Sequence, residues 1–299
     1  MTIPTPAIPA AVVPEPVPAA RGRSARRTHD RPLEPIELTL TGFAAGGKAV
    51  GHAPDGRVVF VEYGLPGERV IAEITDAHPS YIEATAVLVL EASEDRIVPP
   101  CQYFGKCGGC QLQHVAYKRQ LELKTGVVRD QLMRIGRFSQ DEVDLLVRPM
   151  LGMDEPWGYR NHNRFTARRD GEVGFMQRGT HRFMRIEECL IAHPRVNEVL
   201  KVTQDRTMQS RQISVRVGAN TGDRMIQPRL QWRPHSRGPR PASGQATYTE
   251  ELNGTRYRVS GPAFFQVNTA QAEQLVALVV QHVLETNAHV VVDAYAGVG

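Results

Sequence analysis

The sequence predicts a multidomain α+β protein: a small OB-like β-barrel at the N-terminus, a central β-rich domain, and the beginning of an α/β Rossmann-like domain. Three observations support this fold class. The length of 299 residues exceeds what one hydrophobic core usually serves. Short β-branched segments separated by turn residues occupy most of the chain. Near residue 290 an apolar run leads into a glycine-rich turn, which is the pattern that opens many nucleotide-binding α/β domains.

Residues 1–33 are rich in proline and arginine and contain little that could form a core. This composition is typical of a disordered tail. Such a tail is either a solvated extension or an electrostatic arm that finds RNA, and the sequence leaves both interpretations open.

Residues 34–93 are expected to form the barrel. Four β-branched segments, at 36–40, 58–63, 69–75 and 82–90, alternate with turn residues, and Pro54-Asp55-Gly56 has the chemistry of a turn. Barrels of this size often bind single-stranded nucleic acid on an open face. Lys48, in the glycine-rich part of this segment, is therefore a candidate RNA contact.

Residues 94–260 are expected to form the central domain. A helix is predicted over 115–137, followed from residue 159 by β-rich segments with a Pro/Gly/Arg-rich loop near 228–244. The basic stretch from Arg160 to Arg185 is interleaved with aromatic residues, which in strands gives one charged and one apolar face. Its candidate RNA contacts are Arg160, Arg164 and Arg168, and the alternative is a solvated sheet face.

The four cysteines follow the pattern Cys101-x5-Cys107-x2-Cys110, with Cys189 further along the chain. Three thiolates from one loop and a fourth from elsewhere suit a cubane iron–sulfur cluster. Zinc, which more often uses two Cys-x2-Cys pairs, is an alternative, and so are disulfides or free thiols. His114 is a rival ligand, but the four cysteines already complete the set.

The last 39 residues, 261–299, are expected to begin an α/β domain. A helix is predicted over 269–285, with Asn268 as its N-cap. The apolar run 289–292 followed by Asp293-Ala294-Tyr295-Ala296-Gly297-Val298-Gly299 fits the first strand and turn of a class I methyltransferase that uses S-adenosylmethionine (SAM). A tight turn after a buried strand is the structural alternative.

Composition and charge restrict the possible partners. No run of 18 apolar residues exists, and prolines interrupt the apolar N-terminal stretch, which argues against a membrane span and a signal peptide. The cytoplasm is the expected compartment, and a monomer is the expected state. The net charge of +4 and the pI near 9.0 are compatible with a polyanionic partner without establishing one.

The segment from Pro100 to His114 closely resembles the cluster loop of the uracil-5 RNA methyltransferases, whose 23S ribosomal RNA members hold a 4Fe-4S cluster. Residues 36–92 resemble that family's TRAM domain, residues 157–161 and 174–175 its central domain, and residues 261–268 the entry to its methyltransferase domain. The resemblance implies 23S rRNA as substrate, SAM as methyl donor, and a cluster on Cys101, Cys107, Cys110 and Cys189. It also implies that Gln266 and Tyr295 contact SAM, while Asp293, Gly297 and Gly299 shape the turn.

The resemblance further implies covalent catalysis, in which a cysteine thiolate adds to carbon 6 of uracil so that carbon 5 attacks the methyl group of SAM. Because all four cysteines are assigned to the cluster, the nucleophile and base are expected beyond residue 299, and this chain is expected to be an inactive fragment. A tRNA uracil-54 methyltransferase is one alternative, although such enzymes are expected to lack the TRAM domain and the cluster. Radical-SAM methylthiotransferases need a Cys-x3-Cys-x2-Cys motif that is absent, and the remaining alternative is a non-catalytic, RNA-binding iron–sulfur module.

Overall fold

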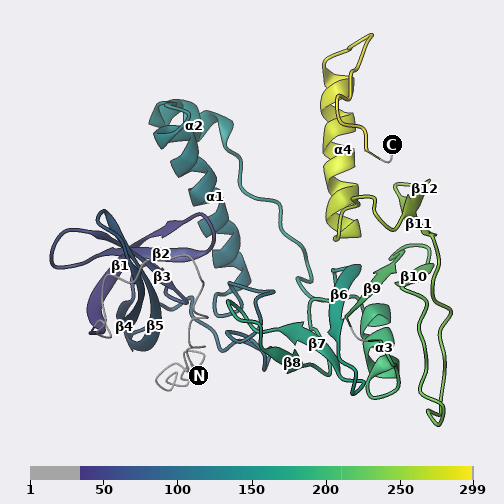
Figure 1. Ribbon diagram of the computed structural model, residues 1–299. Helices are drawn as coiled ribbons and strands as arrows, with labels where there is room; N and C mark the ends of the chain where they lie inside the picture. The colour runs from purple at the N-terminus through teal and green to yellow at the C-terminus, as the bar shows by residue number, and fades with distance from the viewer. Residues whose placement is uncertain (1–33, 210, 298–299) are drawn as a thin grey trace, which may run out of the picture. The chain divides into compact units, whose positions relative to one another are not determined.

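The computed structural model describes residues 34–209 and 211–297 (Figure 1). The expected tail over 1–33 and the expected cofactor residue Gly299 therefore lie outside the described residues. The described chain divides into two compact units: the first contains residues up to 152 together with 177–182, and the second contains 153–176 and the residues from 183 onward. The domain boundaries expected at residues 93 and 260 concern smaller divisions of the chain and stay predictions.

The first unit begins with a closed five-stranded barrel, as the sequence predicts. Its strands are ordered β1-β2-β3-β5-β4, and β3 and β5 run parallel. Alternate residues of each strand point inward, as in β3, where Val59 and Val61 are fully buried. The strand bounds are β1 (Ile36–Ala44), β2 (Lys48–His52), β3 (Val58–Glu62), β4 (Arg69–Ala77) and β5 (Tyr81–Glu91).

Strand β2 is the one barrel strand that the pattern of β-branched residues misses. It contains Gly51, where a Cβ atom would lie 2.8 Å from a side-chain carbon of Leu38 and from the backbone oxygen of Thr39. The close approach of β1 therefore requires glycine in a strand that otherwise has few strand-forming residues. The expected turn after β2 is present, with the Gly56 N–H donating to the Ala53 carbonyl over 2.9 Å.

Two helices follow the barrel in the first unit. Helix α1 (Tyr117–Arg134) lies within the range predicted for it. Helix α2 (Gln140–Leu146) was not expected, because seven residues are too few to show a clear apolar period. Its sequence signal is a capping box, in which the Ser139 side chain accepts from the Glu142 N–H and the Glu142 carboxylate accepts from the Ser139 N–H.

The second unit is built on a five-stranded antiparallel sheet of order β10-β9-β6-β7-β8. Helix α3 (Pro194–Thr203) packs against it with Val196, Val199 and Leu200 buried. The β-rich segments expected from residue 159 are present, and α3 lies among them as a helix that was not predicted; its sequence signal is Pro194 in the first turn. The strand bounds are β6 (His162–Ala167), β7 (Val173–Met176), β8 (Phe183–Arg185), β9 (Gln212–Val217) and β10 (Arg224–Gln227).

A hairpin of β11 (Thr247–Leu252) and β12 (Thr255–Ser260) precedes helix α4 (Thr269–Glu285). The predicted helix and its N-cap are both confirmed, since the Asn268 side chain accepts from the Gln271 N–H over 3.1 Å. The predicted strand over 289–292 is wrong: these residues form no strand in the described chain, and Val290 and Val292 are each 80% exposed. A strand needs a hydrogen-bonding neighbour, and no described segment supplies one here.

Within the described ranges, no helix combines the length and apolar character that a membrane crossing requires.

Candidate nucleic-acid interface and cysteine loop

The cysteine loop lies in the first unit and is folded by its own backbone. The Phe104 N–H donates to the Cys101 carbonyl over 3.0 Å, and the Cys107 N–H donates to the Tyr103 carbonyl over 2.8 Å. Gly105, with φ of +83°, occupies a left-handed conformation that permits this tight path. The aromatic ring of Phe104 is buried and anchors the loop against Tyr63 of the barrel segment.

Among the thiols of the loop, that of Cys107 has a shifted pKa. Burial raises the pKa of the Cys107 thiol, an N–H of Gly109 opposes that shift, and the neighbouring Cys101 adds to it. All four cysteines lie in the described chain, each is half-buried, and no disulfide joins them. Cys189 belongs to the second unit, where its backbone N–H donates to Asn197 over 3.0 Å.

The fit of these residues to a metal site can be tested on the side-chain positions. Among the described residues, no three His, Cys, Asp or Glu side chains are arranged so that they could hold a metal ion. The expected convergence of four sulfur atoms on one small volume is therefore not confirmed. The assignment of Cys101, Cys107, Cys110 and Cys189 to a cluster stays a prediction.

His114 is a core residue of the first unit. It is 1% exposed and packs against the rings of Tyr63 and Phe104, with centroid distances of 6.1 and 5.7 Å. Burial, reinforced by the positive charge of Arg96, lowers the pKa of His114 to about 3. The ring is consequently neutral at physiological pH and serves the core.

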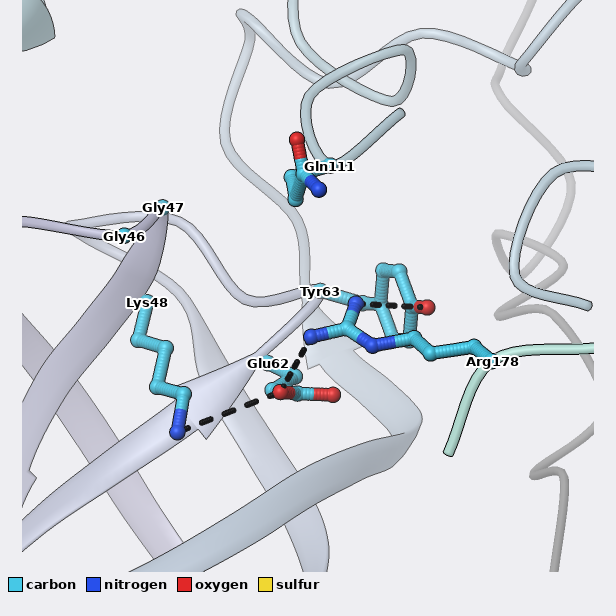
Figure 2. Close-up of a pocket in the computed structure, with 7 residues that line it drawn as sticks. All are labelled: Gly46, Gly47, Lys48, Glu62, Tyr63, Gln111 and Arg178. Atoms are coloured by element: carbon cyan, nitrogen blue, oxygen red, sulfur yellow. Dashed lines mark hydrogen bonds and ion pairs between the residues drawn. The ribbon is translucent and has the colours of Figure 1, made fainter. Parts of the chain in front are cut away.

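Lys48 lies in a small pocket of the first unit (Figure 2). Its ammonium group is 3.1 Å from the Glu83 carboxylate and 3.9 Å from that of Glu62. Arg178 reaches the same Glu62 at 2.6 Å and donates to the Tyr63 hydroxyl at 3.2 Å. Two carboxylates thus compensate the charge of Lys48, which weakens its candidacy as a phosphate contact. The pocket is lined by Gly46, Gly47, Lys48, Glu62, Tyr63, Gln111 and Arg178.

The three candidate arginines of the second unit lie on or beside β6. Along this strand Asn163, Phe165 and Ala167 are buried and Arg164 is exposed, so the expected alternation of an apolar and a polar face is confirmed. Arg168, just after the strand, is 3.2 Å from each of the carboxylates of Asp170 and Glu172.

Strands β6 and β9 bring a basic cluster together on the polar face. His162 pairs with Arg216 across the two strands and Arg164 pairs with Ser214. Burial and the charges of Arg216, Arg164 and Arg160 lower the pKa of His162 to about 4. Its Nε2 atom is 3.1 Å from the Ser214 hydroxyl. Arg216 and Ser214 are functional candidates that sequence reasoning missed, because only the strand register reveals their neighbours.

The expected SAM contacts do not form a site within the described residues. Gln266 is exposed, and its backbone carbonyl accepts from the Asn161 side chain over 3.1 Å. Tyr295 is 95% exposed, and its N–H donates to the Asp293 carboxylate over 2.9 Å. Gly297 has φ of +65°, which agrees with the expected turn. No hydrogen bond or ring contact joins Gln266 to Tyr295 in the described chain.

The chain is similar to one protein-family model and to curated RNA methyltransferases. Residues 34–87 match the model of the TRAM domain. An uncharacterized RNA methyltransferase of Caldanaerobacter subterraneus subsp. tengcongensis is 31% identical over 89% of this chain and 69% of its own length. Another from Streptomyces avermitilis is 34% identical over 89% of this chain and 68% of its own length. The chain thus spans about two thirds of these relatives.

A solved structure is also similar. The tRNA (uracil-54, C5)-methyltransferase of Pyrococcus abyssi, in complex with S-adenosyl-L-homocysteine, superposes with a TM-score of 0.58 and 20% identity over 82% of this chain and 64% of that one. At this level of identity the similarity shows the fold alone. From the sequence relatives and the TRAM barrel, we conclude that this chain belongs to the RNA methyltransferase family.

Proposed function

We propose that this protein takes part in the SAM-dependent methylation of carbon 5 of a uridine in 23S rRNA. The observation that carries the proposal is the basic polar face of β6 and β9 in a chain that also contains a TRAM barrel. The solved neighbour is named as a uracil C5 methyltransferase and holds S-adenosyl-L-homocysteine, the product left when SAM has given up its methyl group. The resemblance of the cysteine loop to the 23S rRNA enzymes favours ribosomal over transfer RNA.

The proposed chemistry determines what the chain must supply. Carbon 5 of uracil is a poor nucleophile until a thiolate adds to carbon 6 and pushes electron density onto carbon 5. Carbon 5 then takes the methyl group from SAM, a base removes the carbon 5 proton, and the thiolate leaves. With Cys101, Cys107, Cys110 and Cys189 assigned to a cluster, no cysteine of residues 1–299 is assigned as nucleophile. We therefore propose no catalytic residue in this chain.

The proposed cofactor residues divide into two sets. Gln266 and Tyr295 would contact SAM, with Asp293, Gly297 and Gly299 shaping the adjoining turn, and the support for them is the resemblance in sequence. The four cysteines would hold a 4Fe-4S cluster, for which the support is their spacing. The side-chain positions described above do not by themselves make a metal site, so we route no chemical step through the cluster.

The first experiment tests RNA recognition. Replacing Arg160, Arg164 and Arg168 together with alanine should weaken binding to a 23S rRNA transcript, because each lost phosphate contact removes counterion release and lowers the salt slope by about 0.7 to 0.9. A matched control replaces three arginines outside this face, Arg134, Arg240 and Arg256, and should leave the slope nearly unchanged. Equal affinity and slope for the triple variant and the wild type would show that β6 presents only a solvated face.

The second experiment tests substrate and activity. The 299-residue chain is incubated with tritiated SAM and with unmodified 23S rRNA or tRNA, and binding to each RNA is measured in parallel. We expect tighter binding to 23S rRNA and no methyl transfer, because no thiolate of the chain is assigned to carbon 6. Methyl incorporation at a uridine of 23S rRNA would contradict the cysteine assignment, and incorporation into tRNA would favour the transfer-RNA alternative.

A further inference from the structure

The polar face of the second unit's sheet contains an unbalanced group of positive charges. Strands β6 and β9 are adjacent in the sheet (Figure 1), and their register places His162 opposite Arg216 and Arg164 opposite Ser214. Cross-strand partners share a face, so these four side chains lie together. Arg160, two residues before β6, joins the group by donating its Nε–H to the His162 carbonyl over 3.0 Å.

The guanidinium of Arg216 is the unusual member. Arg216 is 5% exposed, its Nη1 donates to the Ala263 carbonyl over 2.8 Å, and its Nε has no hydrogen-bond partner. No carboxylate of the described chain forms an ion pair with it. The buried carboxylate of Glu250 accepts instead from the N–H groups of Ala219 and Asn220. A buried, uncompensated charge is costly, and an anionic ligand would offset that cost.

Arg160 and Arg164 also have no ion pair with any described carboxylate, whereas other arginines of the same unit do. Arg168 is held by Asp170 and Glu172, and Arg185 is held by Asp205 at 2.7 Å. Arginines at the margin of this sheet thus have carboxylate partners, whereas those beside His162 have none among the described residues. The uncompensated positive charge is therefore concentrated around His162.

The arginines around His162 create a positive electrostatic field at its ring. The pKa of His162 falls to about 4 through burial and through the three guanidinium groups of Arg216, Arg164 and Arg160, so the imidazole is neutral at physiological pH. Its Nε2 and the Ser214 hydroxyl, 3.1 Å apart, form a neutral polar pair beside the charges. Ser214 can then turn its O–H toward an anion, while Arg164 offers exposed N–H donors.

We propose that Arg164, Ser214 and Arg160, with Arg216 behind them, form a binding site for one phosphodiester group of the RNA backbone. The inference rests on the proposed function, in which the substrate is RNA, and it assigns one phosphate of the RNA backbone to this group of side chains. Arginine donors and a hydroxyl are the usual ligands of RNA phosphates, and a phosphodiester carries one negative charge. The polar residues Thr166, Gln212 and Gln227 continue the same face, as expected if the RNA strand extends along it.

Single substitutions distinguish RNA binding at this site from a general attraction of RNA to basic residues. Arg164→Ala should weaken binding to a 23S rRNA transcript about tenfold and lower the salt slope by about 0.7, the value for one lost contact in single-stranded RNA. Ser214→Ala should weaken binding by a smaller factor of about threefold, in line with one lost neutral hydrogen bond. The matched control is Arg185→Ala, in the same sheet but paired with the carboxylates of Asp205 and Glu187, and it should change affinity by less than about twofold.

Nuclear magnetic resonance of the His162 ring supplies a second readout, which does not depend on the RNA assay. A short oligouridylate should shift the His162 and Ser214 resonances in wild type and should not do so in Arg164→Ala. If the chain binds RNA but Arg164→Ala and Ser214→Ala match the wild type in both readouts, the site is overturned while the proposed function stands. If inorganic phosphate shifts these resonances and RNA does not, the site binds free phosphate and the RNA assignment is wrong. If neither shifts them, the proposed anion site is wrong.

Discussion

A buried ion pair in the first unit gives the clearest expectation at the scale of single residues. Glu68 is fully buried and Arg96 is 3% exposed, and they meet through two hydrogen bonds of 2.6 and 2.7 Å. Arg96→Met would leave the Glu68 carboxylate without its partner, which should lower the free energy of unfolding by about 3–5 kcal/mol. Urea unfolding followed by circular dichroism measures this loss.

The matched control is Arg69→Met. Arg69 forms ion pairs with two carboxylates, Glu37 and Glu91, on the barrel surface, where water screens the charges. Its loss should cost less than about 1 kcal/mol. Equal destabilisation by the two variants would mean that the buried pair contributes no more than an exposed one.

His114 predicts a pH dependence of stability. Because its pKa in the folded protein is lowered to about 3, from 6.5, the unfolded chain binds the proton more tightly. Stability from this group is therefore complete above pH 6.5 and declines as the pH falls toward 3. Between pH 7 and pH 5 the loss should be about 2 kcal/mol by proton linkage.

The variant His114→Gln removes the titrating group while keeping a polar side chain of similar size. Urea unfolding of the two proteins at both pH values isolates the contribution of this one histidine from that of the remaining titratable groups. The wild type should lose more stability on acidification than the variant does. Identical losses would show that His114 takes up its proton in the folded protein as easily as in the unfolded chain.

Single residues also show what sequence can and cannot predict about the site. The density of arginine around Arg164 is visible in the sequence, and so is the alternation that exposes it. The carboxylates that compensate Arg168 are also near it in sequence, at Asp170 and Glu172, whereas Glu83 reaches Lys48 only because separate strands come together in the barrel. Arg216 is likewise far from His162 in sequence and opposite it in the sheet.

At the scale of elements, helix α4 tests the capping prediction. Asn268 accepts from the Gln271 N–H, which would otherwise lack a partner in the first turn of the helix. Asn268→Ala should therefore destabilise the helix by about 1 kcal/mol, whereas Asn268→Asp, which keeps the acceptor, should cost only a few tenths. Hydrogen exchange of the α4 amides measures both. Equal protection in the alanine and aspartate variants would contradict a capping role.

The elements that can be predicted from the sequence are those whose own residues show a strand or helix periodicity. The barrel strands other than β2 have β-branched alternation, and α1 and α4 are long enough for helical periodicity to be visible. The short helices α2 and α3 lack that length, and their caps are the better guide. The run 289–292 has strand-forming residues, yet a strand also requires a neighbour, which local sequence cannot provide.

At the scale of the whole molecule, sequence order and spatial units diverge. Residues 177–182, between β7 and β8, belong to the first unit, where the Arg178 N–H donates to the Lys106 carbonyl over 2.9 Å and Gln177 pairs with Cys107. The expected linear succession of domains could not anticipate such an exchange, since it depends on contacts between distant segments. The cysteine loop is therefore supported by a segment that follows it by about 70 residues.

The cysteine assignment predicts the metal content of the molecule. Four thiolates that hold a 4Fe-4S cluster should give a brown protein with about four irons per chain after anaerobic purification. Replacing Cys189 with serine should remove most of the iron, since the fourth ligand would be lost. His114→Gln is the matched control, because His114 lies in the same motif but is assigned to the core, and it should retain the wild-type iron content.

Iron and sulfide analysis with absorption spectroscopy distinguishes the possible outcomes. A cluster is the expected result and would support the assignment of all four cysteines. Stoichiometric zinc without visible absorbance would replace the iron–sulfur assignment with a zinc site on the same thiols. A colourless protein without metal would leave Cys107 as a half-buried thiol whose pKa is raised by burial. One cysteine of the chain would then be available as the nucleophile that the proposed methylation requires.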